Sequence, residues 1–254
     1  MAVKNVLLKC KGLGFGYGGH EAQTGFTLPF DFELRAGEVV ALMGVNGCGK
    51  STLLKTLSGQ ISMLSGDVFV VQKNPENSLA NLKSLTPRIL AKRIALVRMS
   101  GLAPDRMTVR EFVSLGRSPY AGILDGRSAE DDVAVDGALD LLELQSFADR
   151  MVTSLSDGER SRVYLAEAVA QQVQILLLDE PNAFLDIPRS HKLFKLLRKL
   201  AQDRNMGIVV STHSVEYAEK YCDRIMVIDG GNVRVATSSD ARAEGLLDWT
   251  EFED

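Results

Sequence analysis

Residues 44–52 read GVNGCGKST and carry the clearest chemistry of this chain. They follow the apolar run EVVALM and precede the helix-like run KSTLLKTL, so we expect a strand, a loop and a helix in that order. The spacing G-x-x-x-x-G-K-S is that of the phosphate-binding P-loop, in which backbone N–H groups and a helix N-terminus surround phosphate oxygens. The sequence therefore predicts a nucleoside triphosphate site formed by Gly44, Val45, Asn46, Gly47, Cys48, Gly49, Lys50, Ser51 and Thr52.

Three side chains of this loop have distinct chemistry. Lys50 can reach the terminal phosphates, and the Ser51 hydroxyl can hold a magnesium ion. Cys48 lies close to a lysine and to a helix start, which together favour a thiolate. We interpret Cys48 as an inhibitor-sensitive thiol and not as a catalyst.

A second set of candidate residues ends the buried run ILLLDEP. Asp179 and Glu180 follow this strand directly, which places both carboxylates at its carboxyl end, beside the P-loop. Asp179 suits water-mediated magnesium binding, and Glu180 suits polarisation of an attacking water. The alternative is a strand that ends in a solvated acidic turn, but hydrolysis needs a second carboxylate whereas binding alone does not.

The segment LSDGE at residues 155–159 has a serine and a glutamate at capping-box spacing, which predicts a helix that begins at Ser156. The free N–H groups of such a helix offer an anion site. Taken alone, these five residues are more typical of an ordinary capped surface helix.

The alternation of apolar runs and helical stretches predicts an α/β fold with a mainly parallel sheet. Short buried strands are expected at 39–43, 175–179, 208–212 and 224–229, and an amphipathic helix at 189–204. Between them, helix signals dominate in 99–153, among them the capping-box pair Thr108/Glu111 and a further helix start at Ser128 with Asp131. We expect a single domain whose core comprises 1–98 and 154–254, with 99–153 as an inserted helical subdomain.

The bulk composition excludes several classes of protein. With 29 Lys and Arg against 33 Asp and Glu, the formal net charge is −4, so nucleic acid is not expected as a partner. No run of about eighteen apolar residues is present, so no membrane span is expected, and the N-terminus lacks a secretory signal. Three scattered cysteines argue against a disulfide framework.

These motifs occur in the order found in ATP-binding-cassette (ABC) ATPases, and the chain resembles that family along essentially its whole length. The resemblance implies a P-loop NTPase (RecA-like) core with an N-terminal antiparallel β portion. It also implies that Tyr17 stacks on adenine, although the ring could instead pack on the sheet. Ser156 and Gly158 would contact the γ-phosphate of ATP held by an opposite subunit. Asp186 would be the D-loop residue, and His213 the switch histidine that hydrogen-bonds the γ-phosphate.

Two positions depart from the family pattern. A glutamine is expected at the end of the strand that leads into the helical subdomain, and the run IALVRMSG has Met99, or alternatively Arg98, there. Methionine supplies neither a strong hydrogen bond nor a hard magnesium ligand. The acidic Asp157 and Glu159 replace neutral residues near the expected phosphate, which is unfavourable unless they point away or cap the helix.

The segment MTVREFVSLGRSPY resembles the ATPase subunits of iron-chelate, haem and cobalamin importers. This resemblance implies an ATPase that uses ATP and Mg2+ and dimerises when ATP binds. Its partners would be membrane permease subunits and, in the whole complex, a substrate-binding protein. The subunit would lie at the cytoplasmic face of the inner or plasma membrane, held there by the permease.

Two other functions fit the same motifs. One is a soluble ABC ATPase in assembly or repair, such as iron–sulfur cluster assembly. The other is a nucleotide-gated binding module whose hydrolysis is weak because of Met99. A P-loop kinase would leave LSDGE and NAFLD without a role, and a GTPase would need an N-K-x-D motif that this sequence lacks.

Overall fold

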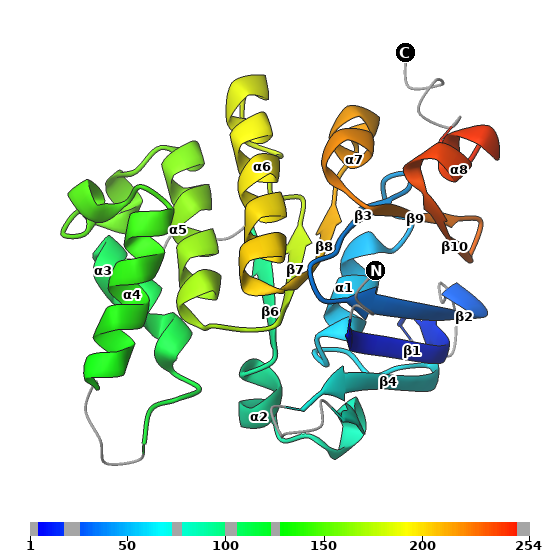
Figure 1. Cartoon of the computed structure of the whole chain (residues 1–254), viewed down its shortest axis with the longest axis horizontal. Helices are drawn as coiled ribbons and strands as arrows, with labels where there is room; N and C mark the ends of the chain where they lie inside the picture. The colour runs from blue at the N-terminus through cyan, green and yellow to red at the C-terminus, as the bar shows by residue number, and fades with distance from the viewer. Residues whose placement is uncertain (1–4, 18–25, 73–77, 100–105, 123–127, 248–254) are drawn as a thin grey trace.

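The computed structural model describes residues 5–17, 26–72, 78–99, 106–122 and 128–247. Figure 1 shows two sheets side by side. Helices pack around the larger sheet, and a group of helices, from α3 (Val109–Ser114) to α5 (Asp157–Ala170), lies at the left of the view.

The helices and strands have the following bounds. The strands are β1 (Val6–Phe15), β2 (Phe26–Arg35), β3 (Val39–Met43), β4 (Ser65–Val71), β5 (Leu79–Asn81), β6 (Ile94–Arg98), β7 (Ile175–Asp179), β8 (Gly207–Ser211), β9 (Arg224–Asp229) and β10 (Asn232–Thr237). The α-helices are α1 (Lys50–Leu57), α2 (Pro87–Ala91), α3 (Val109–Ser114), α4 (Ala129–Leu141), α5 (Asp157–Ala170), α6 (Ile187–Arg204), α7 (Val215–Tyr221) and α8 (Ser238–Ala243). Short 3₁₀ turns occur at Leu82–Ser84, Leu115–Arg117, Gln145–Phe147 and Val152–Ser154.

The sheets confirm the predicted α/β class. The larger sheet has the order β10-β9-β3-β8-β7-β6, in which β9 to β6 are parallel and β10 is antiparallel to β9. The smaller sheet, β2-β1-β4-β5, is antiparallel throughout, which confirms the N-terminal antiparallel portion. Because β3, β8, β7 and β6 are parallel, their carboxyl ends meet at one edge, where ligands of such sheets bind.

The central strands are apolar throughout because both faces of the larger sheet are covered. In β3, Val39, Ala41 and Met43 belong to the core beneath the helices α3 to α7. Val40 and Leu42 belong to a second core, which contains α1 and the antiparallel sheet. A strand that alternates between two cores has no polar face, which accounts for its unbroken apolar sequence.

The helical group is built from α3, α4 and α5, which pack against one another (Figure 1). The described residues 106–122 and 128–153 contain helices and turns but no strand, as predicted for this part of the chain. The expected capping box from Thr108 to Glu111 is present, and the helix start expected at Ser128 also has a capping box, with Asp131. The predicted range 99–153 covers α3 and α4, and α5 follows it and packs on both.

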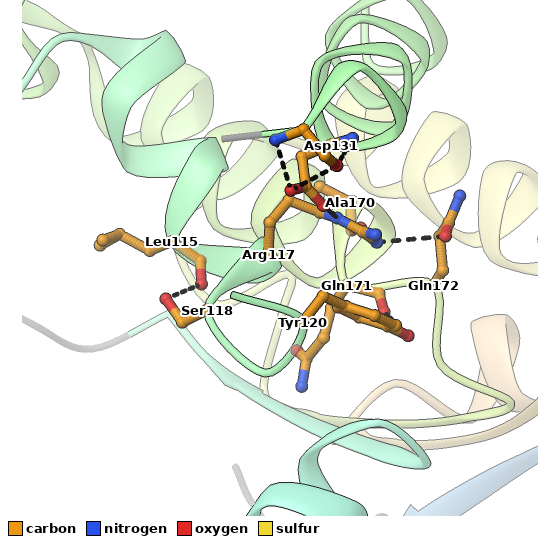
Figure 2. A network of polar contacts seen from close by, with 9 residues as sticks. Leu115, Arg117, Ser118, Tyr120, Asp131, Ala170, Gln171 and Gln172 are labelled. Atoms are coloured by element: carbon orange, nitrogen blue, oxygen red, sulfur yellow. Dashed lines mark hydrogen bonds and ion pairs between the residues drawn. The ribbon is translucent and has the colours of Figure 1, made fainter. Parts of the chain in front are cut away.

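Arg117 joins the parts of this group (Figure 2). Its Nε donates to Asp131 Oδ1 at 2.8 Å, and one terminal nitrogen donates to the backbone oxygen of Ala170 at 2.8 Å and to Gln172 Oε1 at 3.1 Å. The guanidinium also lies over the ring of Tyr120, 3.9 Å from its centroid. Since the side chains of Arg117 and Asp131 are only 8% and 10% exposed, this is a buried ion pair, and the same guanidinium makes two further hydrogen bonds.

We expect Asp131→Asn to lower the free energy of unfolding by roughly 1–3 kcal/mol at pH 7, because it leaves a buried guanidinium without its counter-charge. The hydrogen bond from Arg117, followed by those from Ser128, lowers the pKa of Asp131 to about 2. A carboxyl group whose pKa is lowered on folding stabilises the protein at pH values above its pKa in the unfolded chain, which is about 4 for an aspartate. The difference between wild type and variant should therefore shrink as the pH falls from about 4 toward 2, as measured by unfolding at several pH values. Asp140→Asn, an exposed change on the same helix, is the control, and an equal loss in both variants would contradict the prediction.

Candidate functional site

The phosphate loop lies between β3 and α1, as predicted. Gly44 has φ +143°, and a Cβ there would lie 2.5 Å from the backbone oxygen of Ile228, so only glycine fits. Gly49 is the residue before α1, has φ +108° and provides no side-chain cap. The first N–H groups of α1 are therefore not capped by a side chain and can meet an anion.

The ammonium group of Lys50 is held over the loop. Its Nζ donates to the backbone oxygens of Gly44 at 2.8 Å and Val45 at 3.2 Å, and the residue is only 5% exposed. A buried ammonium at this position can donate to an anion that enters the loop. The Ser51 hydroxyl, at the second position of α1, is exposed on the same turn.

The expectation of a Cys48 thiolate is wrong. Cys48 is only 9% exposed, and burial raises the pKa of its thiol above the ordinary value. The positive charge of Lys50 and a backbone hydrogen bond act in the opposite direction but do not outweigh the loss of solvent. The thiol stays protonated near neutral pH and fills space against Gly44.

The carboxyl end of β7 brings four polar residues together. Glu180 Oε1 lies 2.8 Å from His213 Nε2, and both side chains remain partly exposed, at 41% and 37%. Asp179 Oδ1 accepts a hydrogen bond from the Ser211 hydroxyl at 3.1 Å. The predicted Asp179, Glu180 and His213 therefore meet at one edge of the sheet, and Ser211, which sequence reasoning missed, joins them. Its signal in the sequence was a serine at the end of the otherwise apolar run IVVS.

The residues present fit a magnesium ion bound together with phosphate. Within the described residues, no group of three or more His, Cys, Asp or Glu side chains forms a complete metal site. Mg2+ is usually held by one or two carboxylates with water and substrate phosphates, so a full protein cage is not needed. The hydroxyl of Ser51 and the carboxylate of Asp179 are hard oxygen ligands of the required kind.

The segment LSDGE forms the start of α5. Ser156 accepts from the backbone N–H of Glu159 at 3.4 Å, and Glu159 Oε2 accepts from the backbone N–H of Ser156 at 2.8 Å, which confirms the capping box. The bond from the backbone N–H of Ser156, followed by one from its hydroxyl to the same carboxylate oxygen, holds the pKa of Glu159 below its ordinary value. Asp157 is paired with Arg160. Both acidic side chains thus have local partners, which reduces the unfavourable effect of their negative charge near the expected phosphate.

Gly158 faces a neighbouring segment of the same chain. A Cβ at this position would lie 3.3 Å from the side chains of Leu185 and Arg189. Asp186 caps α6, where its Oδ1 accepts from the backbone N–H of Arg189 at 2.8 Å. In the part of the chain that the structure describes, no hydrogen bond or ion pair joins Ser156 to the phosphate loop or to the carboxyl end of β7.

Two remaining candidates lie at strand ends. Tyr17 follows β1 and is 55% exposed, and its ring makes no contact with another described ring. Met99 follows β6 and is buried in the core beneath the helices, whereas Arg98 is exposed and lies in register with Asp179. Arg98, the alternative to Met99, is therefore the residue level with Asp179 at this edge.

Comparison with known proteins adds the evolutionary context. The family model described as ABC transporter matches residues 28–183. The hemin import ATP-binding protein HmuV of Rhodococcus jostii is 37% identical over 85% of this chain and 70% of its own length. A chain assigned to a metal-chelate type ABC transporter in an inward-facing conformation is 28% identical, with a TM-score of 0.81 over 96% of this chain and 90% of its own. A bacterial ABC transporter cassette solved as a dimer is 27% identical, with a TM-score of 0.77 over 91% of this chain and 99% of its own.

Proposed function

Since this chain belongs to the ABC transporter family of ATP-binding proteins, we propose that it is the ATP-hydrolysing subunit of an importer for an iron chelate, haem or cobalamin. Family membership makes the protein an ATPase, and the relatives named as import ATP-binding proteins support membrane permease partners. The importer assignment is supported by the relatives named for hemin and metal-chelate transport. The observation that carries hydrolysis is the 2.8 Å contact between Glu180 and His213 at the edge of the sheet where the phosphate loop begins.

In the proposed mechanism, the phosphate loop and Lys50 hold the ATP phosphates. Ser51 and Asp179 would hold Mg2+, and the chemistry that the ion would supply there is positive charge next to the transferring phosphoryl group. Glu180 orients and polarises the attacking water, and His213 keeps the Glu180 carboxylate in place and hydrogen-bonds the γ-phosphate. Tyr17, which is 55% exposed, is proposed to stack on adenine.

The second half of the site is proposed to come from another copy of the chain. Ser156 and Gly158 of that copy would contact the γ-phosphate, and Asp186 would lie at the seam between the two copies. The dimeric form of the bacterial cassette supports this arrangement. ATP would then close the dimer, and hydrolysis would reopen it.

The permease is proposed to hold the subunit at the cytoplasmic face of the membrane. None of the helices in the described ranges has the length and apolar character needed to cross a bilayer. A substrate-binding protein is proposed for the complete importer.

The importer assignment is tested by replacing the native gene with the Glu180→Gln variant and measuring uptake of labelled ferric chelate, haem and cobalamin. Because hydrolysis resets the transporter, we expect uptake of one of these cargoes to be lost while the level of the protein stays unchanged. If all three are taken up at the wild-type rate although the purified variant has lost its ATPase activity, the protein serves another process.

A further inference from the structure

Ser211 connects the two carboxylate residues at the end of β7. It is the last residue of β8, fully buried, on the strand between β3 and β7. Its hydroxyl donates to Asp179 Oδ1 at 3.1 Å and accepts from the backbone N–H of Glu180 at 2.8 Å. One hydroxyl group thus contacts the side chain of the first acidic residue and the backbone of the second.

The position of Ser211 follows from where the strand pairing stops. The registered pairing of β7 with β8 ends at Leu178 and Val210. Beyond this pair, the backbone N–H of Glu180 has no strand partner, and a partly buried donor without an acceptor is unfavourable. The Ser211 side chain supplies that acceptor.

The backbone of Glu180 needs such support. Its φ is +49°, in the left-handed region that residues other than glycine seldom adopt. Residues are held in such conformations where their surroundings determine them, and such sites cluster where function depends on geometry. Here the N–H of Glu180 is fixed by Ser211 and its carboxylate by His213.

Ser211 is itself held rigidly. The next residue, Thr212, is 1% exposed, and its N–H donates to the backbone oxygen of Leu42 at 3.1 Å. Leu42 belongs to β3, which leads into the phosphate loop. A continuous set of backbone and side-chain contacts therefore runs from the strand of the phosphate loop to both acidic residues.

We propose that Ser211 is a positioning residue for ATP hydrolysis, which orients the Asp179 carboxylate toward magnesium and fixes the backbone from which Glu180 reaches the attacking water. Ser211 touches neither nucleotide nor water in this proposal and acts only through its two neighbours. The inference rests on the proposed ATPase mechanism and adds a residue to it.

The test is the steady-state ATPase activity of purified Ser211→Ala. Losing hydrogen bonds to a carboxylate and to a strained backbone should lower kcat about 10- to 100-fold. The KM for ATP should stay within about threefold, because the phosphate loop is untouched. The Mg2+ concentration for half-maximal activity should rise, since Asp179 loses a fixed orientation. If Ser211 only stabilised the fold, Ser211→Ala would lower the thermal midpoint of unfolding but would not lower kcat while leaving KM nearly unchanged.

Two further variants make the result decisive. Ser211→Thr keeps the hydroxyl and should recover most of kcat. Ser211→Cys, whose larger thiol is both a weaker donor and a weaker acceptor, should lie between alanine and wild type. Ser114→Ala is the matched control, since among the described residues the hydroxyl of Ser114 bonds only to its own helix, at the Arg110 backbone oxygen. If Ser211→Ala retains wild-type kcat while Glu180→Gln is inactive, the inference on Ser211 fails but the ATPase mechanism stands. If the wild type itself does not hydrolyse ATP, the proposed function fails.

Discussion

Glu180→Gln is expected to lower the ATPase kcat about 10²- to 10⁴-fold, because the amide cannot accept a proton from the attacking water. The amide can still hydrogen-bond His213, so the geometry at the end of β7 should persist. Nucleotide affinity should stay near the wild-type value, since Glu180 lies outside the phosphate loop. With hydrolysis blocked and binding retained, Mg-ATP should convert the variant into a stable dimer, which light scattering after size-exclusion chromatography detects.

Glu130→Gln provides the matched control, because it makes the same chemical change at an exposed position on α4. This control should keep wild-type turnover and should not accumulate as an ATP-bound dimer. If Glu180→Gln hydrolyses ATP at the wild-type rate, Glu180 is not the base, and the role assigned to the 2.8 Å contact with His213 is wrong.

Lys50→Ala is expected to raise the Kd for Mg-ATP about 10- to 100-fold, the cost of losing a charge-assisted hydrogen bond to phosphate. The variant also removes the bonds from Nζ to Gly44 and Val45, so the loop loses an internal tie as well. Titration with a fluorescent ATP analogue measures the affinity directly, without depending on turnover.

Lys55→Ala is the control on the same helix, since that side chain lies in the last turn of α1, away from the loop. It should bind nucleotide like the wild type. Equal affinity in all three proteins would show that Lys50 does not contact the phosphates and would remove the basis for the predicted triphosphate site.

Much of the core could be predicted because short strands that are buried on both faces leave an unmistakable apolar pattern. The predicted strands at 39–43, 175–179 and 224–229 coincide with β3, β7 and β9. β8 runs from Gly207 to Ser211, one residue earlier than predicted, and this shift places Ser211 at the strand end.

The candidate site was predictable where a motif fixes the backbone. The glycine spacing at 44–52 predicts the phosphate loop. The apolar run of β7 predicts that Asp179 and Glu180 lie at the edge of the sheet. The contact of Glu180 with His213 depends on β7 and β8 being neighbours, which only the assembled sheet reveals. The role of Ser211 could not be predicted for the same reason, because its two partners, Asp179 and Glu180, lie at the end of the adjacent strand β7.

Cys48 illustrates how local reasoning fails on electrostatics. Its neighbours in sequence favour a thiolate, but the pKa depends on solvent exposure, and the folded chain covers the thiol. The Arg117 network has a similar origin. The partners of Arg117 are Asp131, Ala170 and Gln172, which lie outside the segment GRSPY that contains it. The sequence of this segment therefore could not predict a buried ion pair.

The sheet order also sets when this protein can begin to work during its synthesis. β3, which leads into the phosphate loop, ends at Met43, but both of its neighbours, β8 and β9, begin only at Gly207 and Arg224. A ribosome that has completed only the first two thirds of the chain therefore exposes a β3 with no strand beside it. Pairing between such distant segments is slow to form, and unpaired apolar strands are prone to aggregate. Nascent chains should acquire nucleotide affinity late and abruptly, and truncation before β9 should leave an insoluble product instead of a weak binder.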